Sequence, residues 1–363
     1  MATPQGALHH AVLLSQFAQD WRPPQQDYYM VPELFPVVTV GKEFDDFLRI
    51  NSSTWRQTSG SLVSASGDVS TVDFFRDTDG TYRAKPYALR GIIDLKERAA
   101  ADDIVRYEQL KTEVPLVTLH NDLEVDGLRV ALTKANLGTS YETVPGDQMF
   151  DNLFGAANPV LYIERKCARI KRSTGFKVTD VILDDLTWRA IKWHPTTLQW
   201  LGVHNDSPGY QLLTPKILEE KLAEVMEPGA VKVTCFRLEN ARAPVTLDNS
   251  DIRAPMGPHL IISYNQKNTS QTDWSGFKCF SWTGESDSET GLKFEGGDDF
   301  DPKAPIGVFT FPMPSHGQRG SIAVQVVTNR AFVVGRKESI FVAFDCVDKN
   351  NAALYGNELK YPL

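Results

Sequence analysis

Residues 158–195 read NPVLYIERKCARIKRSTGFKVTDVILDDLTWRAIKWHP, and the first half of this stretch predicts an amphipathic helix. Asn158 is a good N-cap, and Pro159 suits the first helical turn, where its missing N–H costs nothing. Gly175 supplies the left-handed residue that ends the helix. Apolar residues recur between these ends at spacings of three and four: Val160, Ile163, Cys167 and Ile170. One face of this helix is therefore expected to lie on a core.

The second half of the same stretch predicts a strand and another helix. Residues 178–183 form a short apolar run of the kind found in buried strands. Asp184 or Asp185 caps the following helix. That helix ends by His194, because the residue before Pro195 is pushed out of helical geometry. Helix, strand and helix thus follow one another with almost no spare residues.

The polar face of the first helix is basic, with Arg165, Lys166, Arg169, Lys171 and Arg172. Such a stripe is explained by a solvated helical face with pairing to Glu164. In an assembly it would face a neighbouring subunit or packaged DNA. The residues alone leave both explanations open.

Length and charge set the first limits on function. A chain of 363 residues is long for one compact core, so two or three sub-domains are expected. Lys and Arg total 38 against 46 Asp and Glu, a formal net charge of -8. This balance argues against a protein whose main task is binding phosphates. DNA is expected as a neighbour rather than as a specific ligand.

The cysteines and the apolar runs indicate where the chain is made. The four cysteines, at 167, 235, 279 and 346, show no metal-ligand spacing, which favours buried, reduced thiols. Residues 7–20 lack the basic start and the small-residue cleavage site of a signal peptide. No apolar run approaches the roughly 20 residues needed to span a bilayer. We expect synthesis in a reducing cytoplasm and no membrane segment.

Three further patterns precede the 158–195 stretch. Residues 31–40, VPELFPVVTV, form an extended segment broken twice by proline. Residues 72–76 alternate against residues 82–84 across an Asp-Gly turn, which predicts a β-hairpin that is only marginally stable alone. Residues 115–135 carry the longest helical pattern, whose weakest point is Gly127.

This order of elements resembles the major capsid proteins of tailed bacteriophages, of the Hong Kong 97 type. The resemblance lies in the hydrophobic-Phe-Pro-Val motif at 34–37, in the long helix, and in the Thr-Gly-Phe turn and His-Pro ending of the 158–195 stretch. A capped helix at 214–226 and a strand at 231–238 resemble the A-domain of that family. The resemblance covers about residues 32–347 and rests on order and pattern rather than on an invariant signature.

The resemblance implies an α+β fold, the phage major capsid fold. Its parts are an N-terminal arm, an extended E-loop hairpin, a P-domain with a long spine helix and a β-meander, and an A-domain. The implied boundaries are 1–46 for the arm, 47–92 for the E-loop, 93–195 for the P-domain with the spine helix, 196–320 for the A-domain and 321–363 for the C-terminal P-domain strands.

The resemblance also implies a structural protein and not an enzyme. Its copies are expected to assemble as hexamers and pentamers into an icosahedral virion capsid around double-stranded DNA, in the host cytoplasm. Expected partners are other copies of the chain, a separate scaffolding protein, a portal and a decoration protein, with DNA contacted non-specifically. The arm and hairpin would bury apolar side chains on neighbouring subunits. The predicted intersubunit contact residues are Trp21, Phe74, Phe75, Arg76, Tyr82 and Arg83.

The sequence predicts no catalytic, metal or cofactor site. It holds no Walker A motif, dinucleotide fingerprint, Gly-x-Ser-x-Gly elbow or His-Glu-x-x-His motif. The acidic run at 295–301 could collect a hard cation, but a solvated charge run is the ordinary explanation. Two alternatives stay open: an encapsulin compartment that encloses a cargo enzyme, and a cytosolic α/β enzyme whose site is built from residues distant in sequence.

Overall fold

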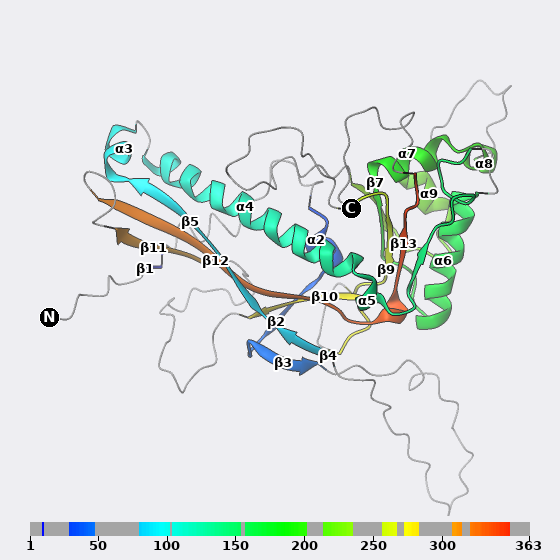
Figure 1. The fold of residues 1–363 in the computed structure, drawn as a ribbon, viewed down its shortest axis with the longest axis horizontal. Coiled ribbons are helices and arrows are strands. Elements are labelled where there is room, and N and C mark those ends of the chain that lie inside the picture. Colours follow the sequence, from blue (N-terminus) through cyan, green and yellow to red (C-terminus); the bar gives the residue numbers. More distant parts are fainter. Residues whose placement is uncertain are drawn as a thin grey trace, which may run out of the picture.

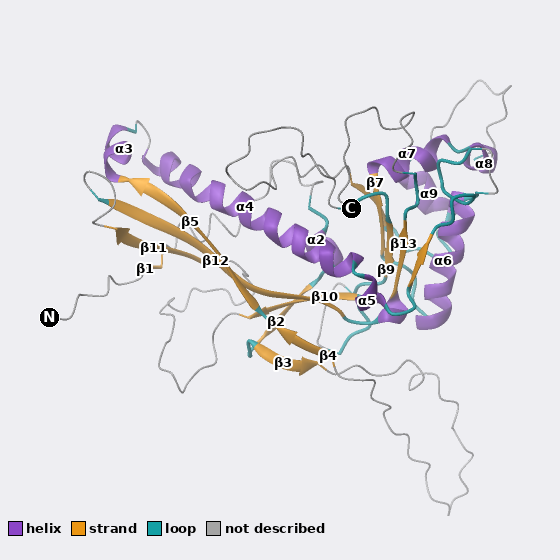
Figure 2. Cartoon of the chain, in the orientation of Figure 1, coloured by secondary structure: helices purple, strands orange, loops and turns teal. Residues whose placement is uncertain are grey.

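The computed structural model describes residues 9–10, 29–47, 80–101, 104–153, 157–201, 213–234, 256–266, 272–282, 307–313 and 320–348. The described elements form two parts of an elongated molecule (Figure 1). At one end a long helix lies along a six-stranded sheet, and at the other end shorter helices flank a five-stranded sheet. Both parts mix helices with strands (Figure 2), so the fold is α+β.

The stretch at 158–195 folds as predicted. Helix α6 (Pro159–Thr174) begins at Asn158, whose side chain accepts a hydrogen bond from the N–H of Leu161 at 3.0 Å. It ends at Gly175, which has a φ of 85°. Strand β7 (Asp180–Asp184) is buried throughout, and Asp184 caps helix α7 (Asp185–Trp193). The strand starts later than predicted, because Val178 pairs only in an isolated bridge with Met226.

Strand β7 lies inside a sheet of order β6-β13-β9-β7-β8. It pairs antiparallel with β9 (Leu260–Ser263) and parallel with β8 (Val231–Thr234). Strands β13 (Ile340–Phe344) and β6 (Tyr141–Thr143) complete the sheet beyond β9. Helix α8 (Pro195–Trp200) contacts α6 and α7, and α9 (Pro215–Lys221) contacts β8.

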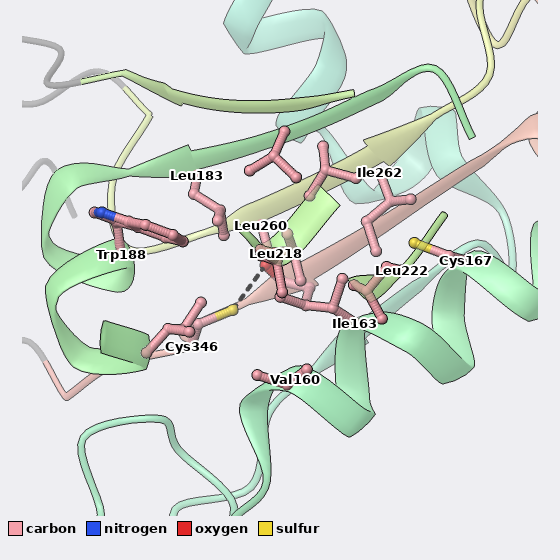
Figure 3. Packing of buried hydrophobic residues seen from close by; sticks show 14 of the residues in the cluster. Val160, Ile163, Cys167, Leu183, Trp188, Leu218, Leu222, Leu260, Ile262 and Cys346 are labelled. Carbon is pink, nitrogen blue, oxygen red and sulfur yellow. Dashed lines mark hydrogen bonds between the residues drawn. The ribbon is translucent and has the colours of Figure 1, made fainter. Parts of the chain in front are cut away.

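One apolar core lies between this sheet and its helices (Figure 3). It joins Ile163 of α6 to Leu183 of β7, Leu218 of α9, Leu260 of β9 and Cys346 after β13. These residues come from all three of the ranges predicted as 93–195, 196–320 and 321–363. The boundaries at 195/196 and 320/321 therefore do not separate independent cores, because the strands that bury one another lie on both sides of each boundary.

The second sheet has the order β1-β11-β12-β10-β2, and β5 pairs with β12 as well. Helix α4 (Ile104–Leu132) packs on β5 and β12 through Leu116, Leu119 and Leu123. The short helix α3 (Leu95–Ala100) connects β5 to α4, and α5 (Lys134–Leu137) follows α4. The strands are β1 (His9–His10), β2 (Val37–Val40), β5 (Lys85–Asp94), β10 (Phe277–Trp282), β11 (Gly307–Met313) and β12 (Ser321–Val334).

Helix α4 begins at Ile104, well before the predicted start at Pro115, and it ends at Leu132, before the predicted end at residue 135. Pro115 therefore lies inside the helix and not in its first turn. Proline has no N–H, so the carbonyl of Lys111 loses its helical partner at this point. Gly91 of β5 lies against that carbonyl, and a Cβ on Gly91 would overlap the carbonyl oxygen and come within 3.2 Å of Pro115 Cγ. The strand thus covers the break that Pro115 makes in the hydrogen bonding of the helix.

The predicted C-terminal β-meander is divided between the two sheets. Strand β12 ends at Val334, the 3-10 turn η4 (Lys337–Ser339) follows, and β13 then enters the five-stranded sheet. Gly335 makes this transfer possible, because a Cβ there would lie 2.6 Å from the carbonyl oxygen of Ser275. The C-terminal strands therefore link the two parts of the molecule rather than closing one of them.

Candidate intersubunit surface

The surface predicted to contact other subunits starts at a small ribbon of two strands. Strands β3 (Phe44–Phe47) and β4 (Gly80–Arg83) are antiparallel, with Phe47 opposite Gly80. The two ends of the connection through residues 48–79 are therefore adjacent. The predicted partner of β4, at residues 72–76, lies outside the described residues, and the partner that the structure shows is β3. We call this β3–β4 ribbon the loop root.

The loop root is anchored on its own chain by aromatic packing. Phe47 and Tyr82 are both buried, and both contact Phe280 of β10, which is fully buried. The ring centroids of Tyr82 and Phe280 are 4.3 Å apart in a stacked arrangement, and those of Phe47 and Phe280 are 5.2 Å apart. The Tyr82 hydroxyl also donates to the carbonyl of Lys42 at 3.2 Å.

This packing does not fit the predicted role of Tyr82 as an intersubunit contact residue. Tyr82 is only 3% exposed, so its ring is covered by its own chain and is not available to a neighbouring subunit. The alternation of the strand places Tyr82 on the face that meets Phe280, and it places Arg83 on the other face. Arg83 is exposed, as its predicted role requires. Four other predicted contact residues lie outside the described residues: Trp21, Phe74, Phe75 and Arg76.

The structure adds Phe44, which was not among the predicted contact residues. Its side chain is 61% exposed and it stands directly opposite Arg83 in the ribbon. The sequence signal was a lone aromatic residue in the polar run Gly41-Lys42-Glu43-Phe44-Asp45-Asp46. An exposed aromatic residue beside an arginine is a composition typical of interface centres. Phe44 and Arg83 thus form the outward face of the loop root.

Other large apolar side chains are exposed on both parts of the molecule. On α4, Leu110 and Val114 are one turn apart and are 56% and 63% exposed. In the part built on the five-stranded sheet, Trp193 at the end of α7 is 55% exposed and Trp200 at the end of α8 is 36% exposed. Such side chains supply area for association with another chain.

Part of the basic stripe of α6 is engaged within the chain. Lys166 forms an ion pair with Glu142 of β6, and its ammonium group lies 4.5 Å from the ring centroid of Phe341. Arg169 donates to the carbonyl of Thr139, and Lys171 donates to the carbonyl of Glu224 at 2.6 Å. These partners lie on other elements rather than at the predicted Glu164. Lys166, Arg169 and Lys171 therefore contact their own chain, while Arg165, Arg169 and Arg172 remain exposed on the surface.

The described thiols and one histidine are structural. Cys167, Cys279 and Cys346 are free and buried, as predicted, while Cys235 lies outside the described residues. Burial raises the pKa of Cys167 to about 12 and that of Cys279 to about 11, so both thiols stay protonated at neutral pH. Burial also lowers the pKa of His194, whose Nδ1 lies 2.7 Å from Thr196 Oγ1.

The described part of the chain shows neither a metal-ligand cluster nor a membrane-spanning helix. Within the described residues, no group of three or more His, Cys, Asp or Glu side chains could hold a metal ion. None of the helices in the described ranges is both long enough and apolar enough to span a bilayer. The acidic run at 295–301 lies outside these ranges.

Comparison with known structures identifies the fold. The chain is similar to a phage-related protein from Bordetella bronchiseptica RB50, with a TM-score of 0.67 and 16% identity over 94% of this chain and 98% of that chain. The two chains share one fold. The α+β fold predicted from the sequence is thereby confirmed as that of a phage-related protein.

Two further similarities are weaker. The capsid structure of cyanophage P-SCSP1u matches with a TM-score of 0.47 and 9% identity, over 95% of this chain and 92% of that chain. The holo-SrpI encapsulin complex from Synechococcus elongatus PCC 7942 matches with a TM-score of 0.47 and 10% identity, over 94% and 97%. The fold assignment rests on the Bordetella protein alone. No protein-family model matches the sequence, and no curated protein matches it.

Proposed function

We propose that this chain is the major capsid subunit of a tailed bacteriophage, a structural protein whose copies form the icosahedral shell around the genome. The observation that carries the proposal is the fold, which is shared over 94% of the chain with a phage-related protein. The exposed apolar residues support it, because a shell subunit must bury part of its surface on other copies.

The loop root is the surface we assign to one of these contacts. Phe280 fixes the ribbon on its own chain, so Phe44 and Arg83 face outward from a firm base. A firm base lowers the entropic cost of association, because the contact residues are already ordered. The aromatic side chain would enter an apolar recess on the neighbouring copy, and Arg83 would pair with a carboxylate of that copy. This contact would belong to the predicted E-loop, residues 47–92.

Contacts of this kind generate rings when the rotation between copies closes. We propose hexamers and pentamers on this basis. A scaffolding protein would guide their assembly in the host cytoplasm, a portal would occupy one vertex, and a decoration protein would bind the outside. Packaged DNA would be contacted non-specifically, since the net charge of the chain is -8.

Two variants at one position test the proposal. Phe44→Ser removes an exposed side chain and should leave the fold of the subunit unchanged, and Phe44→Leu keeps an apolar side chain of similar reach. In sedimentation velocity, we expect wild type and Phe44→Leu to form large particles and Phe44→Ser to remain largely as small species. Unchanged thermal melting of the Phe44→Ser subunit would show that folding is intact. Wild-type protein that stays monomeric under all assembly conditions would contradict the proposal.

The contents of the particles separate the two shell functions. A phage capsid recovered from infected or induced cells would contain double-stranded DNA, and an encapsulin compartment would contain a protein cargo. Nuclease-protected DNA in the particles is the result that we expect. A stoichiometric cargo enzyme without DNA would favour the encapsulin alternative instead.

A further inference from the structure

A short segment, residues 29–35, lies between the two parts of the molecule, and we call it the strap. It contains helix α2 (Val31–Leu34). On the side of the five-stranded sheet, Glu33 forms an ion pair with Lys232 of β8, and the carbonyl of Leu34 accepts a hydrogen bond from Asn265 Nδ2 at 3.0 Å. On the other side the strap lies on α4. It therefore connects the long helix to the five-stranded sheet.

Glu124 of α4 holds the first turn of α2. Its carboxyl group is buried, with Oε1 accepting from the N–H of Met30 at 2.8 Å and Oε2 accepting from the N–H of Val31 at 2.9 Å. The first N–H groups of a helix have no partner inside the helix, so they need acceptors from elsewhere. One side chain on α4 satisfies two of them.

The neighbouring turns of α4 also contact the strap. One turn before Glu124, Asn121 Oδ1 accepts a hydrogen bond from the Tyr29 hydroxyl at 2.7 Å. One turn after it, Gly127 leaves room for Val31, and a Cβ on Gly127 would lie 2.6 Å from both Val31 methyl groups. The predicted weak point of the helix is therefore the seat of the strap.

One neighbouring charge, that of Glu33, disfavours the ionised form of Glu124. Glu33 on the strap is a second acid, and its partner Lys232 lies on the far side, on β8. Tyr29 faces Glu124 from the start of the strap, with its ring 5.7 Å from that of His120 on α4. The acids Asp122 and Asp126 lie on the same helix.

Burial raises the pKa of Glu124 to about 8 because it outweighs the hydrogen bonds from the two N–H groups, which lower the pKa, and Glu33 adds the smallest contribution, which raises it. The same burial raises the pKa of Tyr29 to about 12, so this phenol stays neutral when Glu124 titrates. An ordinary glutamate titrates near 4.3. Because the seated state binds a proton that the released state gives up, seating of the strap is favoured at low pH and weakens as pH rises towards about 8.

We propose that Glu124 is a proton-controlled catch: the strap is seated on α4 while Glu124 carries a proton, and it is released when the carboxyl group ionises. Release would let water reach the carboxylate and would separate it from Glu33. The connection between the long helix and the five-stranded sheet would then loosen above neutral pH. This proposal does not depend on the shell function and concerns the single chain.

Hydrogen exchange of the full chain at pH 6 and pH 9, corrected for the intrinsic rates, tests the catch. We expect the Met30 and Val31 amides of wild type to lose at least tenfold of their protection at pH 9, since each pH unit below the raised pKa changes the equilibrium by up to about tenfold. In Glu124→Gln, which cannot ionise, protection should be equal at both pH values. Asp126→Asn on the same helix should behave as wild type.

A second variant covers the case in which Glu124→Gln does not fold. Glu33 is half exposed, so Glu33→Gln should be tolerated, and it removes the neighbouring negative charge. In Glu33→Gln, protection of the Met30 and Val31 amides should fall at a lower pH than in wild type, because the pKa of Glu124 is raised less without Glu33. Equal wild-type protection at pH 6 and pH 9 would overturn the proposal. So would a decline in Glu124→Gln as large as in wild type.

Discussion

Replacement of Phe280 by alanine is the sharpest test of how the loop root is held. Phe280 is fully buried and is the ring on which both Phe47 and Tyr82 pack. Its removal takes away the ring on which these two side chains pack, and it opens a cavity beside Val38 and Ala331, which belong to the same cluster. The loop root should therefore separate from β10 before the rest of the chain unfolds.

The size of the effect follows from burial and ring contacts. A buried Phe→Ala change costs about 3–5 kcal/mol, which includes the lost transfer free energy and the cavity. Phe280→Leu keeps most of the volume but loses both aromatic contacts, each of which is worth about 0.5–1.5 kcal/mol beyond its area. We therefore expect a loss of about 1–2 kcal/mol for Phe280→Leu and of about 3–5 kcal/mol for Phe280→Ala.

Urea unfolding of the dissociated subunit measures the free energy of unfolding for the three proteins. Limited proteolysis shows where the change acts, and we expect new cleavage within residues 43–47 and 80–84 of Phe280→Ala. Cleavage at α6 should not change, because α6 belongs to a different core. A Phe280→Ala subunit within 1 kcal/mol of wild type, with an equally protected loop root, would refute this account of the anchor.

Three further changes test the rest of the fold. Gly127→Ala should lower stability by about 1–3 kcal/mol in urea unfolding, because its Cβ meets Val31, and adding Val31→Ala should restore most of the loss. Burial raises the pKa of Asp184 to about 7, so this carboxyl group should lower wild-type stability from about pH 4 to pH 7 by at most about 1.4 kcal/mol per unit. Asp184→Asn should remove this contribution and leave that of Glu124, and an unchanged slope would contradict the assignment. Lys278→Met should cost about 3–5 kcal/mol, since it removes the buried ammonium group that forms an ion pair with Asp273 at 2.7 Å. A thermal melt like that of wild type would show that the pair is not needed.

Local signals in the sequence predicted several element ends well. Asn158 and Gly175 bound α6, Asp184 caps α7, and Thr214 caps α9 by accepting from the N–H of Ile217 at 3.3 Å. These ends depend on hydrogen bonds between residues two to four apart, so a single sequence contains the whole cause.

Features that depend on distant residues could not be predicted. A proline in a helix interior normally kinks or breaks the helix. Helix α4 continues through Pro115, and the strand that covers this point, at Gly91, is remote in sequence. Alternation placed Tyr82 and Arg83 on opposite faces of a strand, but the covered face is decided by Phe280, which is remote in sequence. Nor does any pattern near Met30 indicate that Glu124 caps α2.

The predicted sub-domains show the same limit. Helix periodicity found α6, α7 and α9 but could not show that they share a core with β13. Sheet order is set by which strands bury one another, and β12 and β13 are neighbours in sequence that enter different sheets. The predicted contact residue Arg83 is exposed in the structure, and its neighbour Phe44 was recognised only from its exposure.

Electron microscopy of the purified protein tests the central claim most directly. Expressed with its scaffolding protein, the chain should form closed icosahedral shells, in which the loop root of each subunit contacts a neighbouring copy at Phe44 and Arg83. Subunits that stay dispersed, or shells in which both side chains face solvent, would contradict the account.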